Sequence, residues 1–226
     1  MNYFRLKHKS DCRLAVQITS EIINKLPHAT SVLDIGCGDG VVRLHLNKGI
    51  SYQGIDISNA CIYEQVKNDP EIRYVDPNIL VNSIQDAPYH DCLLLLDVIE
   101  HTKEFTELVL ASAKKKPNYI VISLPNELII FDRIRFLFGK ELPAHSLDLI
   151  GLPYGFKHQY IVNIDKARNI LVKELQNYGY NLSSEFYREL KPKKLWFQPV
   201  MWIISRLFPS SIWSMGSIFI FEKNQN

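Results

Sequence analysis

The sequence predicts an α/β protein with a doubly wound, mostly parallel seven-stranded sheet and helices on both faces. Short runs rich in Val, Ile and Leu alternate with amphipathic stretches along much of the chain, and this alternation is typical of parallel strands joined by helices. The run at residues 92–96 is apolar at every position, which indicates a central strand that is buried on both faces.

Length and composition fit one domain over residues 1–226. Hydrophobic residues make up 46% of the chain and charged residues 22%, and the net charge is +2, so nothing suggests disorder or a general affinity for nucleic acid. Residues 195–221 are the most apolar long stretch, but Gln198, Arg206 and Pro209 interrupt it. We therefore expect no membrane-spanning helix.

The cysteines and the first residues indicate a reduced, cytoplasmic protein. The four cysteines show no CxxC spacing, and the opening MNYFRLKHKSD lacks the apolar core of a secretory signal. A structural disulfide or an exported chain is therefore not expected.

Hydrophobic periodicity places the individual elements. Helical spacing predicts helices over residues 11–26, 41–47, 102–115 and 165–178. A further helix over residues 60–67 would follow a cap at Ser58 or Asn59. Short apolar or alternating runs predict strands at residues 31–35, 51–58, 91–101 and 119–126, and within LSSEFYREL and GSIFIFEK. One more strand lies within residues 72–84, where either IRYV or ILVNSI would serve.

Two stretches break the alternation. Residues 126–160 form a long insertion after the fifth strand, and such a connection is more often a functional cover than a linker. Its Arg133, Arg135 and Lys140 lie among aromatic residues, which suits either a lid over an acidic substrate or an amphipathic helix with a solvated basic face. The aromatic-rich segment at residues 191–213 suits peripheral contact with an anionic membrane, a buried helical hairpin or a dimer contact.

A glycine-rich turn follows the first strand in VLDIGCGDG, residues 32–40. Gly36, Gly38 and Gly40 lack a Cβ, so the turn can adopt positive φ and let a flat ligand lie against the backbone. A dinucleotide fingerprint would need a small residue where Val41 stands. The turn therefore favours a different class of cofactor.

Asp56 ends the second strand, 20 positions after Gly36. A carboxylate has two acceptor oxygens and a ribose diol has two donors, so Asp56 is placed to bind both ribose hydroxyls. An adenosine-containing ligand is the implied cofactor.

VLDIGCGDG, YQGIDIS and LLLLDVIEH together resemble the motifs of class I S-adenosylmethionine-dependent methyltransferases, especially the ubiquinone-biosynthesis O-methyltransferases. The resemblance covers the layout of residues 14–185 and implies a Rossmann-like fold with S-adenosylmethionine as cofactor. It implies that Asp34, Gly36, Cys37, Gly38 and Gly40 belong to the cofactor site, with Gly36, Cys37 and Gly38 lining the methionine portion of the cofactor. It also places Asp56 on the ribose, Ile57 on the adenine and Asp97 near the methionine amino group. An acid at the adenine amino group would be Asp76, with Ser83 and Asp86 as alternatives that depend on the third strand's register.

Acceptor chemistry is suggested by DxxEH at Asp97, Glu100 and His101, with His158 following in GFKHQY. The last part resembles the ExxEH metal motif of small-RNA 2′-O-methyltransferases, in which a later histidine completes the site and Asp97 would replace a Glu. In other members the EH pair caps a helix and binds no metal. We expect His101 and His158 to be catalytic residues. Asp97, Glu100, His101 and His158 are also candidate ligands of a divalent metal, although a site without metal is the favoured expectation.

The expected function is methyl transfer from S-adenosylmethionine to a small molecule, at oxygen, with lipids, quinones or lipid-linked glycans as possible substrate classes. One alternative is a metal-assisted RNA 2′-O-methyltransferase, although the near-neutral charge argues against a nucleic-acid partner. The other is a non-catalytic cofactor-binding accessory protein. The sequence does not fix the oligomeric state.

Overall fold

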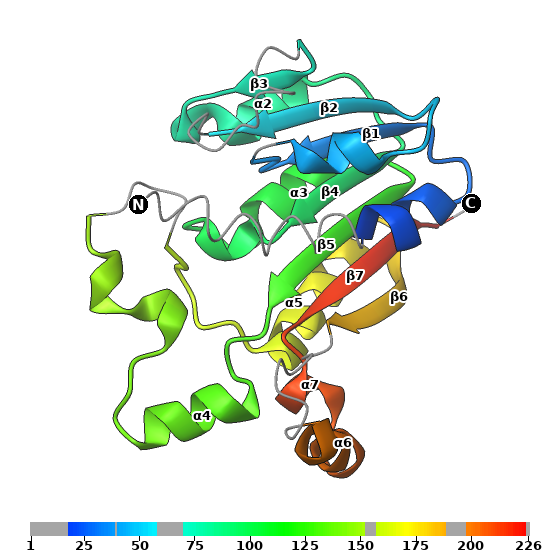
Figure 1. The fold of residues 1–226 in the computed structure, drawn as a ribbon. Helices are drawn as coiled ribbons and strands as arrows, with labels where there is room; N and C mark the ends of the chain where they lie inside the picture. The colour runs from blue at the N-terminus through cyan, green and yellow to red at the C-terminus, as the bar shows by residue number, and fades with distance from the viewer. Residues whose placement is uncertain (1–17, 39, 58–69, 152–156, 189–197, 225–226) are drawn as a thin grey trace.

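The computed structural model describes residues 18–38, 40–57, 70–151, 157–188 and 198–224 (Figure 1). In these residues seven strands form one sheet in the order β3-β2-β1-β4-β5-β7-β6. The strands are β1 Ser31–Ile35, β2 Ser51–Asp56, β3 Ile72–Tyr74, β4 Cys92–Leu96, β5 Tyr119–Pro125, β6 Tyr180–Arg188 and β7 Gly216–Lys223. Strands β1 to β5 pair in parallel, and β7 is antiparallel to both β5 and β6. The predicted fold class is confirmed.

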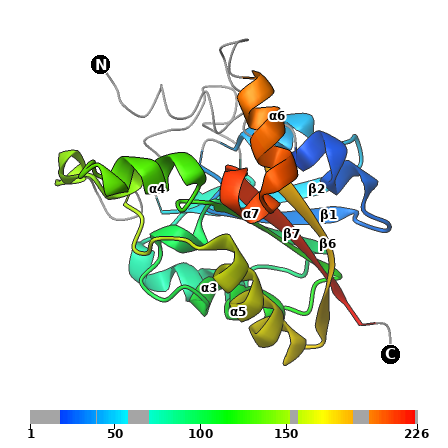
Figure 2. The same ribbon diagram turned by 90° about the horizontal axis from the view of Figure 1, so that it is seen from below.

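Helices lie on both faces of the sheet (Figures 1 and 2). The α-helices are α2 Leu80–Asp86, α3 Glu107–Lys114, α4 Ile130–Leu137, α5 Ile164–Gln176, α6 Gln198–Leu207 and α7 Ser210–Trp213. The short 3-10 helices are η1 Ile23–Lys25, η2 Val41–His45, η3 Pro77–Ile79, η4 Ile99–His101, η5 Pro143–His145 and η6 Leu147–Leu149. None of the described helices is both long enough and apolar enough to cross a membrane.

Two apolar layers follow from the alternation of side chains along the strands. Leu33 and Ile35 of β1 face the layer that α2, α3 and α5 complete, whereas Val32 faces the layer that contains Ile18, in the opening segment. In β4, each residue from Cys92 to Leu95 is fully buried. This is the central strand that its uniformly apolar sequence predicts.

The third strand is IRY rather than ILVNSI, because residues 77–86 form η3 and α2 instead. The helix predicted over residues 41–47 is only the five-residue η2, and the one predicted over 102–115 narrows to α3. The predicted helix at 60–67, its caps and the start of the opening helix lie outside the described residues. Helix α5 ends as predicted, with Gly179 at φ +81°.

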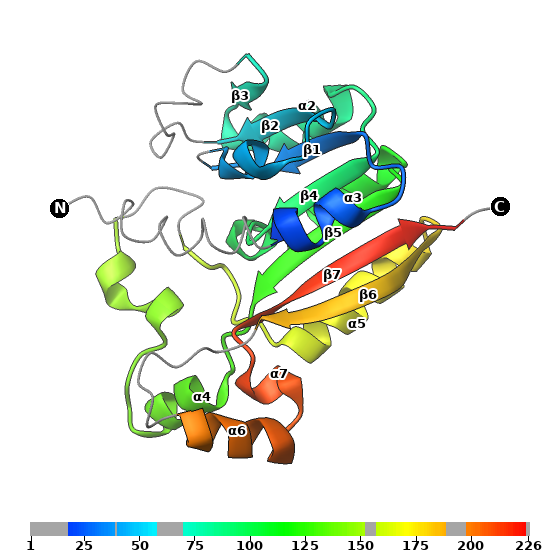
Figure 3. The same ribbon diagram turned by 45° about the vertical axis from the view of Figure 1, so that its right-hand side comes forward.

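The two irregular stretches both contribute helices at one end of the molecule. Helix α4 follows the carboxyl end of β5, and α6 and α7 precede β7, which begins beside that same end because Pro125 pairs with Gly216. Figures 1 and 3 show α4, α6 and α7 grouped beyond this edge of the sheet. The carboxyl ends of β1, β2, β4 and β5 therefore meet at the edge that these helices flank.

Candidate functional site

The glycine turn at the end of β1 adopts the conformation that its sequence predicts. Gly36, Gly38 and Gly40 have φ values of +73°, +56° and +69°, which side chains with a Cβ adopt at a cost. A Cβ on Gly36 would collide with the side chain of Val98, so β1 and the segment after β4 approach closely here. A Cβ on Gly38 would meet no described atom within 4 Å. The second glycine therefore fronts open space where a ligand can approach the backbone.

Asp56 lies directly beside this turn. Its Oδ2 accepts a hydrogen bond from the Gly38 backbone N–H at 2.5 Å, and its Oδ1 accepts one from the Ile57 N–H at 2.6 Å. These bonds fix the carboxylate at the end of β2. The geometry fits the diol-binding role that the sequence predicts.

Asp34 and Cys37 lie beneath the turn rather than in front of it. Asp34 is buried and accepts a hydrogen bond from the Tyr52 hydroxyl at 2.9 Å. Burial, together with the nearby charge of Asp34, raises the pKa of Tyr52 well above its usual value. Cys37 is also buried, and its Sγ would lie 2.8 Å from a Cβ on Gly54. Both side chains support the turn from the core.

The residues expected around an adenine lie at the ends of β2 and β3. Ile57 is half-buried and packs on the main core, and the Val75 N–H donates to the Asp56 carbonyl at 2.8 Å. Asp76 follows at once, but its Oδ1 caps η3 by accepting the Asn78 N–H at 2.8 Å. Asp76 is the second residue after β3, whereas Ser83 and Asp86 lie on α2.

Asp97 is held by a residue that the sequence did not single out. Its carboxylate accepts two hydrogen bonds from Arg188 Nη1, at 2.8 and 2.9 Å, and one from Ser123 Oγ at 2.7 Å. Arg188 is the last residue of β6 and lies 91 positions after Asp97 in the sequence. Of the four candidate metal ligands, Glu100, His101 and His158 lie together, whereas the carboxylate of Asp97 is paired with Arg188.

Glu100 is buried, and neither of its carboxylate oxygens has a hydrogen-bond partner among the described residues. Burial and the negative charge of Asp97 raise the pKa of Glu100 well above its usual value. A buried carboxylate without a donor is costly. The described residues therefore supply no hydrogen-bond donor for the Glu100 carboxylate.

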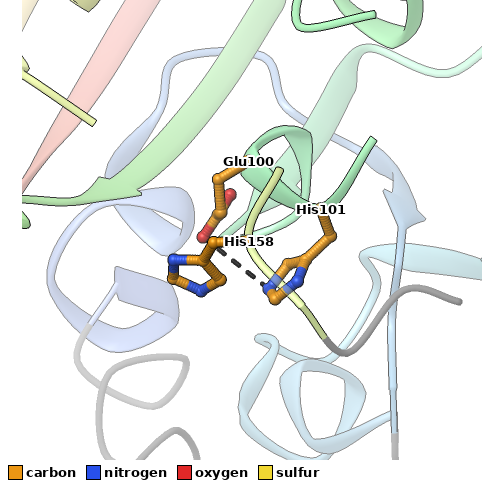
Figure 4. Close-up of side chains that lie close together, drawn as sticks. All are labelled: Glu100, His101 and His158. Carbon is orange, nitrogen blue, oxygen red and sulfur yellow. Dashed lines mark ion pairs between the residues drawn. The ribbon is translucent and has the colours of Figure 1, made fainter. Parts of the chain in front are cut away.

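Two imidazoles face this carboxylate (Figure 4). His101 Nε2 lies 4.0 Å from Glu100 Oε1, and the rings of His101 and His158 meet edge to face with centroids 4.5 Å apart. His101 Nδ1 lies 3.2 Å from the Lys157 carbonyl, which can only accept, so in the neutral ring Nδ1 carries the proton and Nε2 carries the lone pair. One potential ligand atom from each of Glu100, His101 and His158 lies within 4.8 Å of the others. We call these residues the Glu100 cluster.

Glu127 is a second buried acid, and hydrogen bonds satisfy it. Its Oε1 lies 2.6 Å from His158 Nδ1, its Oε2 accepts the Val162 N–H at 2.8 Å, and His145 Nε2 lies 3.2 Å away. Burial alone would raise the pKa of Glu127, but the bonds from His158 and Val162 outweigh it and lower that pKa. Glu127 and His145 were missed in the sequence because only the fold brings residues 127, 145 and 158 together.

The contrast between the two acids indicates where a ligand belongs. Glu127, His145 and His158 could also surround a cation, but Glu127 already has N–H donors on both oxygens. Glu100 has none. A carboxylate with two imidazoles is a donor set that divalent transition metals accept, so the Glu100 cluster fits a cation and Glu127 acts behind it as the group that orients His158.

Comparison with known proteins identifies the family. A family model described as a methyltransferase domain matches residues 6–185. The chain belongs to this methyltransferase family. The match confirms the resemblance to methyltransferases that the sequence motifs show.

The relatives of this chain carry names that state different methyl acceptors. It is 35% identical to a probable tRNA (uracil-O(2)-)-methyltransferase of Caenorhabditis elegans over 118 residues, 50% of this chain and 20% of that protein. It is 26% identical to a ubiquinone biosynthesis O-methyltransferase of Rickettsia bellii, over 68% of this chain and 67% of the relative. The matched part thus spans only about a fifth of the first relative's length.

The fold has clear counterparts among solved structures. The crystal structure of an S-adenosylmethionine-dependent methyltransferase from Archaeoglobus fulgidus superposes with a TM-score of 0.64 and 18% identity, covering 98% of this chain and 100% of the other. At this identity the likeness supports the shared fold.

Proposed function

We propose that this methyltransferase methylates a hydroxyl oxygen of a small molecule bound at the Glu100 cluster. The observation that carries the proposal is the buried, unpartnered Glu100 beside two imidazoles, on a segment whose Val98 abuts the glycine turn. When bound, S-adenosylmethionine supplies an activated methyl group. Gly36, Gly38 and Asp56 would hold this cofactor, with Ile57 and Asp76 at its adenine end and Asp97 nearer the methionine end.

The residues of the cluster would prepare the acceptor. An oxygen nucleophile must be aligned with the methyl group and must lose a proton. His101 would accept that proton at Nε2, because the Lys157 carbonyl holds Nδ1 in its protonated form. His158 is held in the same way as His101, because an acceptor, here the Glu127 carboxylate, lies at its Nδ1.

In the alternative arrangement the same three side chains would hold a divalent cation, and His101 Nε2 would then be a ligand of that cation rather than the base. The fit rests on Glu100, whose buried oxygens have no described donor. A cation there would lower the pKa of a bound hydroxyl. Asp97 would stand outside the ligand set, because Arg188 and Ser123 occupy its carboxylate.

The test combines methyl transfer with cation binding. Labelled S-adenosylmethionine would be supplied with panels of phenols, catechols and other hydroxyl compounds, and Glu100→Gln and His101→Asn should abolish labelling of the acceptor that the wild type modifies. His45→Asn, on the exposed part of η2, serves as the control. Separately, Mn²⁺, Mg²⁺ or Zn²⁺ should raise the unfolding temperature of the wild type but not of Glu100→Gln. A wild type that methylates only amines or thiols, with no cation effect, would contradict the proposal.

RNA is a second candidate acceptor, and one observation favours it. The relative named as a probable tRNA methyltransferase is 35% identical over half of this chain. A ribose 2′-hydroxyl would meet the same chemical requirement as a small-molecule hydroxyl. Adding tRNA and small RNAs to the labelling panel separates the two, because label would then appear in the nucleic acid alone.

A further inference from the structure

The described part of the chain gathers its exposed apolar side chains at one end. Twelve of its eighteen exposed large hydrophobic residues lie within residues 130–150 and 200–215, so this concentration is not the usual scatter of single apolar residues. Those that lie on or directly beside α4 and α6 include Phe136, Leu137, Phe138, Trp202, Ile203 and Leu207. We call these six residues the α4–α6 surface.

The surface belongs to one group of helices. Both α4 and α6 contact α7, and Figures 2 and 3 show the three helices together outside the sheet. Helix α4 has no buried residue, and Leu137 is 81% exposed and Leu207 71% exposed. Along α6, Val200, Ile203 and Leu207 repeat at the spacing of one helix face, yet all three are exposed. These helices therefore present apolar faces that the rest of the described chain does not cover.

Cationic side chains accompany the apolar ones. Arg133 and Arg135 lie on α4, and the Arg206 guanidinium lies 4.2 Å from the ring centre of Trp202 on α6. In the sequence, KPKK at residues 191–194 lies three residues before the start of α6, although its placement lies outside the described residues. Aromatic and aliphatic residues with adjacent Lys and Arg are the composition of helices that lie in the plane of an anionic bilayer.

We propose that the α4–α6 surface binds the surface of an anionic lipid bilayer. A second copy of the chain is the less suitable occupant, because a symmetric contact through this surface would bring the arginines of α4 and α6 against their own counterparts. Anionic headgroups instead pair with these cations while the apolar side chains enter the boundary with the acyl chains.

The experiment is co-sedimentation of the purified chain with lipid vesicles. Wild type should bind vesicles of phosphatidylcholine with phosphatidylglycerol, should bind phosphatidylcholine alone much more weakly, and should release as salt is raised. The variant L137S/F138S and the variant L207S should each lose about tenfold or more in affinity, because they remove apolar area from the contact.

The control is Tyr89→Ser, which removes a side chain that is 54% exposed just before β4, outside the two helical segments. It should bind vesicles like the wild type, and all variants should keep the thermal shift with S-adenosylhomocysteine, which shows that they are folded. Three results would overturn the proposal: no vesicle binding by wild type, equal binding to neutral and anionic vesicles, or concentration-dependent dimerisation that the same substitutions abolish.

Discussion

At the scale of single residues, Glu100 is in the least favourable environment of the acids at the site. It is buried beside the negatively charged Asp97, and burial is the larger cause of its raised pKa. A fold that keeps such a group without a donor sacrifices stability for a ligand. Glu100 should therefore be a point where stability and activity oppose each other.

Replacing Glu100 with Gln should stabilise the cation-free protein at neutral pH and abolish methyl transfer. In the unfolded chain a Glu ionises near about pH 4.3, whereas burial keeps Glu100 protonated to higher pH. Stability contributed by the neutral form is thus present below about pH 4 and is lost as pH rises through the folded-state pKa. Unfolding temperatures measured in chelator between about pH 5 and 8 should show a gap between variant and wild type that widens with pH. A gap that is constant or reversed would contradict this reading of Glu100.

Glu127 should act on activity through His158 rather than through the cofactor. Glu127→Gln removes the charge that fixes His158 Nδ1 at 2.6 Å, and loss of such an orienting acid typically costs about 10- to 100-fold in activity or metal affinity. We expect kcat to fall by that order and the pH profile to shift, while the Kd for S-adenosylhomocysteine stays unchanged. Glu141→Gln, an exposed acid bonded to Ser146 in the same insertion, is the control. Unchanged kcat and pH profile in Glu127→Gln would remove the positioning role.

At the scale of elements, the glycine turn joins the end of β1 to the segment after β4. Gly36 is packed against Val98, whereas Gly38 faces open space, although both have positive φ. The two glycines are therefore required for different reasons. Gly36 permits packing within the protein, and Gly38 permits approach of the ligand.

This difference predicts unequal costs for the two alanine substitutions. Each should carry about 1–2 kcal/mol of left-handed strain, and Gly36→Ala should cost about 1–3 kcal/mol more because its Cβ displaces Val98. Urea unfolding of both variants measures the difference. Equal losses, or a larger loss for Gly38→Ala, would show that Gly36 and Val98 are not in close contact.

Most elements were predictable because their apolar patterns are strong. Both β1 and β4 are short, apolar and ended by the residues expected at a site, and Gly179 ends α5 as its position predicts. The third strand was ambiguous, since IRYV and ILVNSI both fit a strand and only pairing with β2 selects the first. The insertion gave no clear pattern because α4 buries none of its residues and so has no core-facing stripe.

The candidate site was predictable only in part. The glycine turn and Asp56 are local signals, so sequence spacing was enough to find them. Glu127, His145 and Arg188 are paired with residues 18 to 91 positions away, and no periodicity reports such contacts. Arg188 also explains why only three of the four candidate metal ligands form the Glu100 cluster, because it binds the carboxylate of the fourth, Asp97.

At the scale of the whole molecule, one edge of the sheet carries two adjacent half-sites. In the proposed function the glycine turn and Asp56 would form the half that binds the cofactor, and the Glu100 cluster would form the half that binds the acceptor. Val98 links them by packing on Gly36. Helices α4, α6 and α7 flank the same edge (Figure 1), so an acceptor drawn from a lipid surface would enter from the side where the α4–α6 surface lies.

The most direct test of this division is calorimetric titration of S-adenosylhomocysteine into wild type, Asp56→Asn and Glu100→Gln. Asp56→Asn should weaken binding by about tenfold or more, because it removes charge-assisted hydrogen bonds to the ribose, while Glu100→Gln should bind like the wild type. If Glu100→Gln loses the cofactor while Asp56→Asn keeps it, the two half-sites have been assigned the wrong way round and the account fails.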